Sequence, residues 1–347
     1  MTDSAANPSA ADPCPRDAAS NFGPSAPWDR LRERAELLAR LRAFFDAREF
    51  LEVDTPLLSA DTVVDLHIDP LAVNLFDDPR NPEQGTRYWL QTSPEFCMKR
   101  LLAAGSPPAI YQVCKAFRAA ERGPLHNPEF TIVEWYRVGD DYESGIALLA
   151  ELIQSLLNVP RVDRRSYRQA FLEHVGLDPH QATIEEFAAF AARDPTVQLA
   201  DAATIDRDQW LNYLLAQYVE PHLGRDAPEI LCDFPASQAA LARVRALPDS
   251  SQRVAERFEL YYRGIELANG YHELLDPNIL EERNRTNNLA RKKLGKQELP
   301  ESSRMLDAMR SGLPPCVGVA LGFDRLAMVA CGAASIQEVL AFPIDRA

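Results

Sequence analysis

The amino-acid sequence predicts an α+β protein in which a mostly antiparallel β-sheet is flanked by helices. The clearest observation is a pair of β-prone runs within Ala109–Val138, joined by a loop that contains Gly123, an asparagine and two prolines. A second pair of strands is predicted at Arg257–Leu274. Apolar residues between Leu31 and Phe45 recur at three- and four-residue steps, which is typical of one face of a helix. Strand pairs and separate helices together indicate the α+β class.

Composition is that of an ordinary globular protein. The chain has 347 residues, of which 46% are hydrophobic and 25% are charged, enough for one large core or two modest ones. Its net charge of −14 argues against a sequence-independent hold on nucleic acid, which needs a positive surface. Six cysteines without CxxC spacing indicate reduced thiols and hence a cytoplasmic protein. No apolar run reaches the about 18 residues of a membrane span, and the N-terminus has no signal-peptide pattern.

The sequence predicts an N-terminal tail followed by one folded domain. Residues 1–22 are rich in Ala, Ser, Pro and Asp and are expected to be disordered, whereas residues 23–347 are expected to fold. The helix over Leu31–Phe45 should lead into a strand at Phe50–Leu58. The stretch 160–255 is expected to be a mixed, mostly helical insert with a short apolar strand at Glu229–Phe234, and to provide only cover for the site.

Ser93-Pro94-Glu95 follows a short strand and is typical of a helix start, with Ser93 as N-cap and Pro94 at the first helical position. Capping chemistry alone accounts for this triplet. A contact between Glu95 and a ligand is the functional alternative.

The strand pair at Ala109–Val138 carries groups that suit a phosphorylated substrate held against an amine. Arg118 stands at the end of the first strand. Glu134 and Tyr136 stand two apart on the second strand, so they share a face of the pleat. A surface hairpin with scattered charges is the alternative interpretation.

The C-terminal part is predicted to contain two helices, a strand and a last helix. The helix at Leu280–Gln297 carries six basic residues, which indicate a solvated face or, alternatively, a docking surface for an acidic partner. A helix at Pro300–Ser311 follows. Gly322 then ends the strand Val317–Leu321 and allows close backbone approach before the helix that carries Arg325.

Four segments resemble class II aminoacyl-tRNA synthetases, most closely the lysyl type, and they cover nearly everything from residue 28 onward. They correspond to motif 1, motif 2, the strand used for metal and amino acid, and motif 3: Phe50–Pro56, Phe117–Glu121 with His126–Arg137, Gly264–Leu274, and Gly318–Arg325. One departure stands out. The family usually has Glu two residues after the motif 2 arginine, where this chain has Ala120, followed by Glu121.

The resemblance implies the class II catalytic fold and a site for ATP and Mg²⁺. Arg118 would meet the α-phosphate and the attacking carboxylate, and Arg325 the γ-phosphate, as the catalytic groups. Mg²⁺ would be held by Glu259 and Glu266. The other residues implied around ATP are Ala120, Glu121, His126, Asn127, Phe130, Leu267 and Gly322. Of these, Asn127 and Phe130 fit the adenine, and a structural role is equally open for His126.

The resemblance also implies an amino-acid pocket, made by Ser93, Pro94, Glu95, Glu134, Tyr136, Asn269, Glu273 and Ala320. A buried ammonium requires a paired carboxylate, because an uncompensated charge costs several kcal/mol. Three glutamates and a phenol match a diamino acid, which indicates lysine or a close relative.

More narrowly, the chain resembles the elongation factor P lysine ligases, which activate (R)-β-lysine and transfer it to a lysine of elongation factor P. Lysyl-tRNA synthetases carry an anticodon-binding domain before motif 1, whereas only 27 residues precede Trp28 here. Ala320 stands where those synthetases tend to have Gly, although ordinary packing also explains it.

The resemblance implies elongation factor P as partner, no tRNA, and a homodimer through the motif 1 helix and strand; a helix packed on its own sheet is the alternative. A free-standing domain that charges tRNA or another carrier and a non-catalytic regulatory paralogue are the competing functions.

Overall fold

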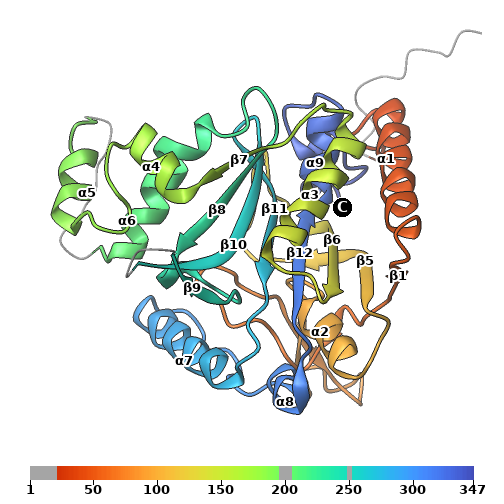
Figure 1. The fold of residues 1–347 in the computed structure, drawn as a ribbon. Helices are drawn as coiled ribbons and strands as arrows, with labels where there is room; N and C mark the ends of the chain where they lie inside the picture. The colour runs from red at the N-terminus through yellow and green to blue at the C-terminus, as the bar shows by residue number, and fades with distance from the viewer. Residues whose placement is uncertain (1–21, 195–204, 248–251) are drawn as a thin grey trace, which may run out of the picture.

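The computed structural model describes residues 22–194, 205–247 and 252–347 (Figure 1). The expected tail at 1–22 lies outside these ranges except for Phe22. Within the described ranges, no helix is long and apolar enough to cross a bilayer. The five cysteines described there are free thiols.

A large, mostly antiparallel sheet forms the centre of the protein, which confirms the predicted α+β class. Only the pairs β1–β5 and β7–β8 are parallel among the strand pairings of the described residues. The order across the sheet is β1 (Leu51–Glu52), β5 (Ala109–Phe117), β6 (Glu129–Val138), β12 (Cys316–Gly322), β11 (Ile265–His272), β10 (Arg253–Tyr262), β8 (Glu229–Pro235) and β7 (Asp163–Ser166), with β9 (Val244–Ala246) beside β10. A separate small sheet has the order β2 (Leu58–Ser59), β4 (Thr86–Leu90) and β3 (Ala72–Leu75).

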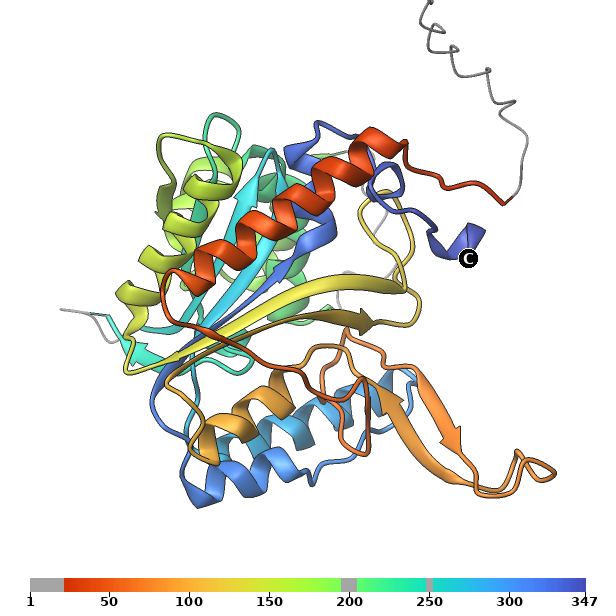
Figure 2. The same ribbon diagram turned by 90° about the vertical axis from the view of Figure 1, so that its right-hand side faces the viewer.

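Helices cover the large sheet on both faces (Figure 2). One face packs against α1 (Trp28–Asp46), α3 (Tyr142–Leu157) and α9 (Phe323–Ala330). The other face meets α2 (Glu95–Ala103), α7 (Pro277–Lys293) and α8 (Arg304–Gly312). The part after α3 adds α4 (Tyr167–His174), α5 (Ile184–Ala191), α6 (Arg207–Leu214) and the short turns η2 (Leu215–Val219), η3 (Glu220–His222) and η4 (Ala236–Gln238).

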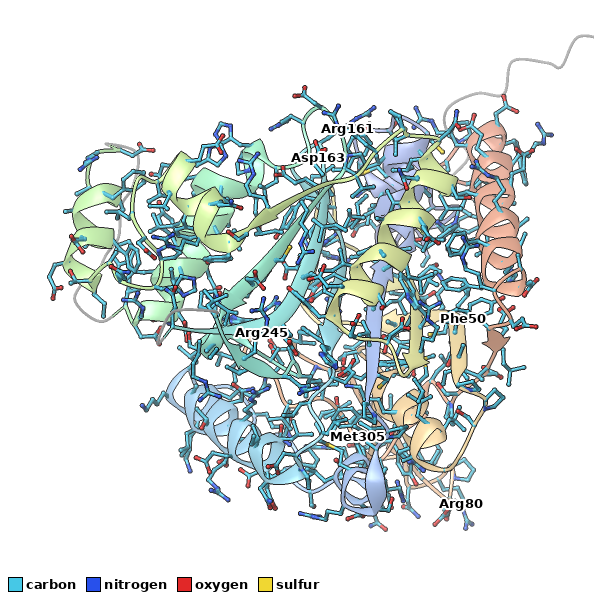
Figure 3. All side chains as sticks on the ribbon, in the orientation of Figure 1. Phe50, Arg80, Arg161, Asp163, Arg245 and Met305 are labelled. Atoms are coloured by element: carbon cyan, nitrogen blue, oxygen red, sulfur yellow. The ribbon has the colours of Figure 1, made fainter. Side chains whose placement is uncertain are left out.

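Alternation along β6 sends neighbouring side chains into two different layers. Val133 and Trp135 join the core under α1 and α3, whereas Tyr136 belongs to the cluster with α2 and α8. Phe50 and Met305, labelled in Figure 3, lie in these two separate apolar layers. The face that carries Glu134 and Tyr136 is therefore the one turned away from the main core.

Several predicted elements differ from those observed. The strand expected at Phe50–Leu58 is two short strands, β1 and β2, because Pro56 lies in the stretch between them and cannot donate a ladder hydrogen bond. Helix α1 buries Leu37 and Phe44 where the predicted face had Ala35, which is exposed. In the stretch 160–255 the expected strand at Glu229–Phe234 is confirmed as β8, whereas β7 is a further strand of the large sheet that was not predicted. Helix α5 begins with a capping box formed by Thr183 and Glu186.

The basic residues of the α7 region are mostly engaged within the chain. Arg291 is 2% exposed, and its guanidinium lies 2.9 Å from Asp69, to which Lys296 also pairs at 2.8 Å. Arg283 donates to the carbonyl of Ala242 at 3.1 Å. The predicted solvated face is wrong for these three residues, which hold α7 and the turn after it against neighbouring loops.

Candidate active site

Four predicted site residues form one row across four neighbouring strands. Glu259 of β10 pairs with Asn269 of β11, which pairs with Ala320 of β12, which in turn pairs with Glu134 of β6. Directly paired residues in a sheet point to the same face. The structure thus brings together side chains that are up to 186 positions apart in sequence, counting from Glu134 to Ala320.

The next row explains a glycine that sequence reasoning did not assign to the site. Gly318 of β12 pairs with Tyr136 on one side and with Tyr271 on the other. A Cβ at Gly318 would lie 2.2 Å from Tyr136 Cε1 and 2.3 Å from Glu273 Oε1. No side chain can be placed at this position without moving Tyr136 and Glu273 from their present positions.

Glu134 is held by two hydroxyl groups. Its Oε1 accepts a hydrogen bond from the Tyr136 hydroxyl at 2.5 Å, and its Oε2 accepts one from Ser93 Oγ at 2.8 Å. Ser93 Oγ also accepts from the Glu95 amide at 3.0 Å, although α2 begins at Glu95 rather than at Pro94. The N-cap of α2 is Pro94, so the predicted N-cap at Ser93 is wrong, and Ser93 instead contacts the amide of the first helical residue and supports Glu134.

Lys99 completes this end of the site, and sequence reasoning missed it. Its Nζ lies 2.5 Å from Glu95 Oε1 and 2.5 Å from Glu273 Oε2. Lys99 is 1% exposed, and Glu273 is likewise 1% exposed. The helical i,i+4 spacing from Glu95 was a signal that could have found it.

Burial and mutual repulsion change the pKa values of these groups. Burial raises the pKa of Glu273 to about 8, with the Lys99 charge opposing and the Glu95 charge reinforcing the rise. Burial raises the pKa of Glu134 to about 7, again reinforced by Glu95. Burial alone would lower the pKa of Lys99, but the charges of Glu273 and Glu95 raise it, so this ammonium stays charged.

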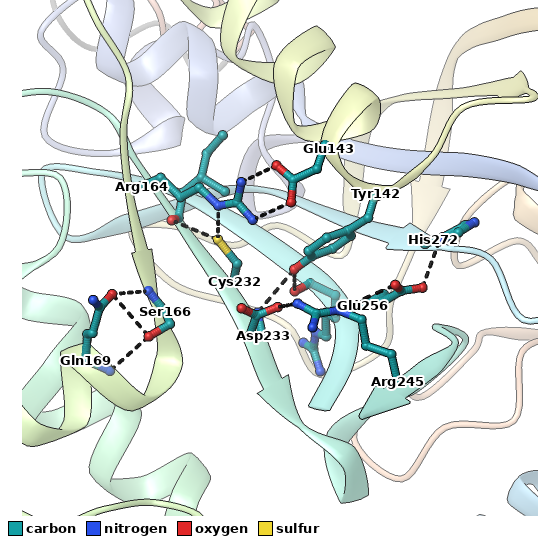
Figure 4. A network of polar contacts seen from close by, with 12 residues as sticks. Tyr142, Glu143, Arg164, Ser166, Gln169, Cys232, Asp233, Arg245, Glu256 and His272 are labelled. Atoms are coloured by element: carbon teal, nitrogen blue, oxygen red, sulfur yellow. Dashed lines mark hydrogen bonds and ion pairs between the residues drawn. The ribbon is translucent and has the colours of Figure 1, made fainter. Parts of the chain in front are cut away.

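A polar network behind β11 anchors the strand end that carries Glu273 (Figure 4). His272 Nδ1 lies 2.7 Å from Glu256 Oε2. Arg245 pairs with both Glu256 and Asp233, and its Nη2 lies 2.7 Å from Asp233 Oδ1. The Asp233 amide donates to the Tyr142 hydroxyl at 3.1 Å. These contacts join α3, β8, β9, β10 and β11 beside the pocket.

Arg118 lies further along the face of β6, at the other end of the site. Its guanidinium carbon is 5.0 Å from the centroid of the Phe130 ring. Its Nη1 is 3.7 Å from Glu121 Oε1. Ala120 has a φ of 64°, in the left-handed region, so the chain turns here and Glu121 is the carboxylate beside Arg118.

The loop between β5 and β6 folds back onto Arg325 of α9. Gly123 and His126 exchange backbone hydrogen bonds at 3.1 and 3.2 Å. Arg325 Nε donates to the Leu125 carbonyl at 3.2 Å, and its Nη2 lies 2.6 Å from His126 Nε2. Burial lowers the pKa of His126, so a neutral imidazole accepts this hydrogen bond.

Two residues implied at ATP are used within the chain. Asn127 Nδ2 donates to the Glu129 carbonyl at 2.6 Å, and its Oδ1 accepts from the Ile344 amide at 2.9 Å. The Leu267 side chain is 2% exposed and belongs to the main core. Both polar atoms of the Asn127 side chain are therefore bonded within the chain, and the Leu267 side chain packs in the core. The roles of these two residues at ATP stay predictions.

A group of three glutamates lies between β10, β11 and the short turn η3. The pairing between β10 and β11 skips Leu267, which forms a β-bulge. Beyond this bulge, Glu266 pairs with Tyr261. The Tyr261 hydroxyl donates to Glu259 Oε2 at 2.6 Å and lies 3.1 Å from Glu220 Oε1. Burial, then the charges of Glu259 and Glu266, raises the pKa of Glu220 to about 7. The stretch 160–255 thus contributes Glu220 to this acidic group, although it was expected only to cover the site.

Comparison with known proteins agrees with this geometry. The family described as tRNA synthetases class II (D, K and N) matches residues 27–346. The chain is 44% identical to the elongation factor P–(R)-β-lysine ligase of Salmonella typhi over 94% of this chain and 99% of that protein. The protein of the same name from Yersinia enterocolitica serotype O:8 / biotype 1B shows the same identity and coverage. The chain therefore belongs to the class II tRNA synthetases of the D, K and N type.

Proposed function

We propose that this protein uses ATP to activate (R)-β-lysine as an aminoacyl-adenylate and transfers it to the side-chain amine of a lysine of elongation factor P. The main support is the cluster of three buried carboxylates, Glu95, Glu134 and Glu273, in a chain whose 44% identical relatives bear that ligase name. Because its proposed partner is a translation factor, we place the reaction in the cytoplasm.

Recognition of the amino acid rests on its two ammonium groups. Each buried ammonium needs a carboxylate partner, and a site built from such partners strongly rejects substrates that lack the matching amine. Asn269 Oδ1 and Glu273 Oε1 are buried and have no hydrogen-bond partner among the described residues. These two oxygens are available to accept hydrogen bonds from an ammonium group, and Ala320 lies between Asn269 and Glu134 to shape that end.

Arg118 and Arg325, which lie beyond Glu134, would recognise the phosphates. On β6, Phe130 and Glu134 are four residues apart on one face, about 13 Å at the usual rise of a strand. This spacing lets an amino acid at Glu134 present its carboxylate toward a nucleotide near Phe130 and Arg118. The carboxylate oxygen attacks the α-phosphorus, the bond to pyrophosphate breaks, and Arg118 and Arg325 neutralise the phosphate charge.

Transfer completes the proposed reaction. The neutral amine of the acceptor lysine attacks the adenylate carbonyl, an amide bond forms, and AMP leaves with the electron pair of the broken bond. The proton lost by the amine passes to a phosphate oxygen or to water.

The glutamates beside Arg325 fit a divalent cation. Burial and then the charges of Glu259 and Glu266 raise the pKa of nearby Glu220, while Arg257 pairs with Glu259 and Arg325 pairs with Glu266. Mg²⁺ takes one or two protein carboxylates together with substrate phosphates. Glu259 and Glu266 would hold it, and it would supply positive charge that neutralises the phosphates.

We also propose a homodimer through α1 and β1. Leu51 and Leu57 are 48% and 40% exposed beside this edge of the sheet, and Leu31 and Leu38 of α1 are only half-buried. Leu51→Glu should shift the sedimentation coefficient to that of a monomer. Leu75→Glu, at a leucine that is 49% exposed on β3, is the matched control and should leave assembly unchanged.

Mass spectrometry of elongation factor P tests the proposed function directly. Incubation with this protein, ATP, Mg²⁺ and (R)-β-lysine should add one β-lysyl group to a lysine of the factor, and omission of ATP should prevent it. A parallel reaction with tRNA in place of the factor should give no aminoacyl product, as the net charge of −14 suggests. An unchanged mass of the factor together with charged tRNA would overturn the proposal in favour of a free-standing tRNA-charging domain.

A further inference from the structure

Lys99 is a buried cation inside the amino-acid pocket to which the proposed reaction assigns no task. It comes from α2 and is 1% exposed. Its Nζ contacts Glu95 and Glu273, each at 2.5 Å, and lies 5.7 Å from the centroid of the Tyr136 ring. A lysine is almost never fully buried unless it is paired, and a buried pair generally stabilises a protein less than apolar packing would. Stability alone therefore does not explain it.

The charges around this pocket can be counted. Glu95, Glu134 and Glu273 are each less than 9% exposed and bring three carboxylates. Lys99 brings one ammonium, so the ionised group carries a net charge of two negative units. The titratable side chains that face it come from α2, β5, β6, β12, β11 and the residue after β11: Glu95, Lys99, Cys114, Glu134, Tyr136, Tyr271, Glu273 and Cys316.

Lys99 also leaves one oxygen of each partner available. It contacts Glu95 at Oε1 and Glu273 at Oε2. Glu273 Oε1 is buried without a hydrogen-bond partner among the residues described, and it packs where a Cβ at Gly318 would otherwise lie. The ammonium thus fixes the orientation of two carboxylates while Glu273 Oε1 keeps its capacity to accept a hydrogen bond.

We propose that Lys99 is a positioning residue that makes the pocket selective for diamino acids. Its fixed positive charge cancels one of three carboxylates, so the two remaining negative charges match the two ammonium groups of the substrate. The substrate carboxylate is left to Arg118. This inference rests on the proposed function and concerns the amino-acid end of that same site.

The test compares the pH dependence of KM for (R)-β-lysine in ATP–pyrophosphate exchange. In Lys99→Met the side chain keeps its length but loses its charge. The neighbouring carboxyls then hold their protons to higher pH, so the rise of KM toward low pH should begin at a higher pH. KM near neutral pH should increase about tenfold or more, as expected for breaking a buried pair, while kcat and the KM for ATP change little. A purely structural role would lower the melting temperature without moving the pH profile.

Glu95→Gln provides a second variant with the opposite expected shift. Removal of this negative charge eases ionisation of Glu134 and Glu273, so the KM profile should move to lower pH. It keeps the experiment decisive should Lys99→Met fail to fold. Lys115→Met is the matched control, because Lys115 is 41% exposed at its side chain and pairs with Glu129 on the hairpin. It should leave both KM values and the pH profile unchanged.

The outcomes separate this inference from the function on which it rests. Native protein that shows no exchange with (R)-β-lysine would overturn the proposed function. Native activity with an unmoved pH profile in the charge variants would overturn only the role of Lys99. Profiles that shift in opposite directions for Lys99→Met and Glu95→Gln support it.

Discussion

Glu121 lies beside Arg118, with 3.7 Å between Glu121 Oε1 and Arg118 Nη1. The turn that brings them together is at Ala120, whose φ of 64° is unusual for a residue with a side chain. Family members usually carry a carboxylate at the position of Ala120. In this chain the following residue supplies a carboxylate next to the motif 2 arginine, so the departure in sequence does not leave Arg118 without an acidic neighbour.

Glu121→Gln should weaken ATP binding. The carboxylate restrains the Arg118 guanidinium, and its loss should raise the KM for ATP about threefold to tenfold, since the pair is partly exposed. Pyrophosphate exchange at varied ATP measures this. Glu129→Gln, on the same hairpin, removes an exposed partner of Lys115 and should have no effect. An unchanged KM for ATP in Glu121→Gln would mean that Glu121 does not support Arg118.

Arg325→Ala should abolish amino-acid-dependent exchange while leaving assembly intact. Arg325 is held by the Glu266 and Leu125 carbonyls at 3.0 and 3.2 Å, which aims a guanidinium at the loop around His126. Loss of an arginine that neutralises the phosphate charge of the transition state costs about a thousandfold or more in kcat. Sedimentation velocity checks that the variant assembles as the native protein does. Near-native exchange would refute a phosphate role for Arg325.

Gly318→Ala should impair the amino-acid pocket and spare the nucleotide end. The added methyl group would lie 2.2 Å from Tyr136 Cε1 and 2.3 Å from Glu273 Oε1, so at least one of them must move. We expect the KM for (R)-β-lysine to rise about a hundredfold, because small displacements of positioning groups are costly. Gly105→Ala is a control in an open turn, although its φ of 86° makes it mildly strained. Unaltered amino-acid kinetics in Gly318→Ala would contradict the close packing seen here.

Local patterns predicted part of this site, and distant partners determined the rest. The shared face of Glu134 and Tyr136 followed from strand alternation, because the side-chain period of a strand is two residues. The seven-residue steps between Glu259, Glu266 and Glu273 indicated nothing about convergence. Their faces depend on a bulge at Leu267 and on pairing with a strand some 50 positions later in the chain.

Lys99 illustrates the same limit. Its helical spacing from Glu95 was visible in the sequence, but its second partner, Glu273, is 174 positions away. A lysine on a helix is ordinarily solvated, and only the sheet that places Glu273 against α2 makes it a buried cation. Similarly, Asn127 is an expected adenine contact whose amide is bonded instead to Glu129 and Ile344.

Amino-acid binding and unliganded stability should depend on pH with opposite signs. Burial raises the pKa of Glu134 to about 7 and that of Glu273 to about 8. Protonated carboxyls pair poorly with ammonium groups, so the KM for (R)-β-lysine should rise as pH falls through this window. The folded state without ligand holds these two protons more tightly than the unfolded chain, so the contribution of Glu134 and Glu273 to stability is fully present below the ordinary pKa of a glutamate and is lost as pH rises through about 7 and 8. Thermal denaturation between about pH 6 and 9, with and without the amino acid, measures both trends.

Glu273→Gln supplies the check on that assignment. It removes one of the titrating groups, so the melting temperature without ligand should fall less steeply with pH than in the native protein. Glu129→Gln alters an exposed carboxylate and should preserve the native slope. Equal slopes in Glu273→Gln and native protein would show that other groups govern the pH dependence.

Arg34 should be required for stability because it joins three segments of the site. Its Nη2 lies 2.6 Å from Asp324 Oδ1 and 2.9 Å from Thr131 Oγ1, while the Thr131 amide donates to Asp324 Oδ2 at 2.8 Å. These contacts link α1 to β6 and to the helix that carries Arg325. Arg34→Met leaves the Asp324 charge buried and should lower the free energy of unfolding by about 3 kcal/mol in urea titration.

The same helix provides a matched control for Arg34→Met. Arg32 pairs with Asp29 in an exposed i,i+3 contact whose side chains are 71% and 86% exposed. Exposed pairs of this kind contribute about 0–1 kcal/mol, so Arg32→Met should be close to native in stability. Exchange activity of Arg34→Met at a temperature where it remains folded should also fall, because Asp324 precedes Arg325 directly and its displacement moves that guanidinium. Equal losses of stability in both variants would indicate a general effect of removing charge from α1 rather than the specific contact with Asp324.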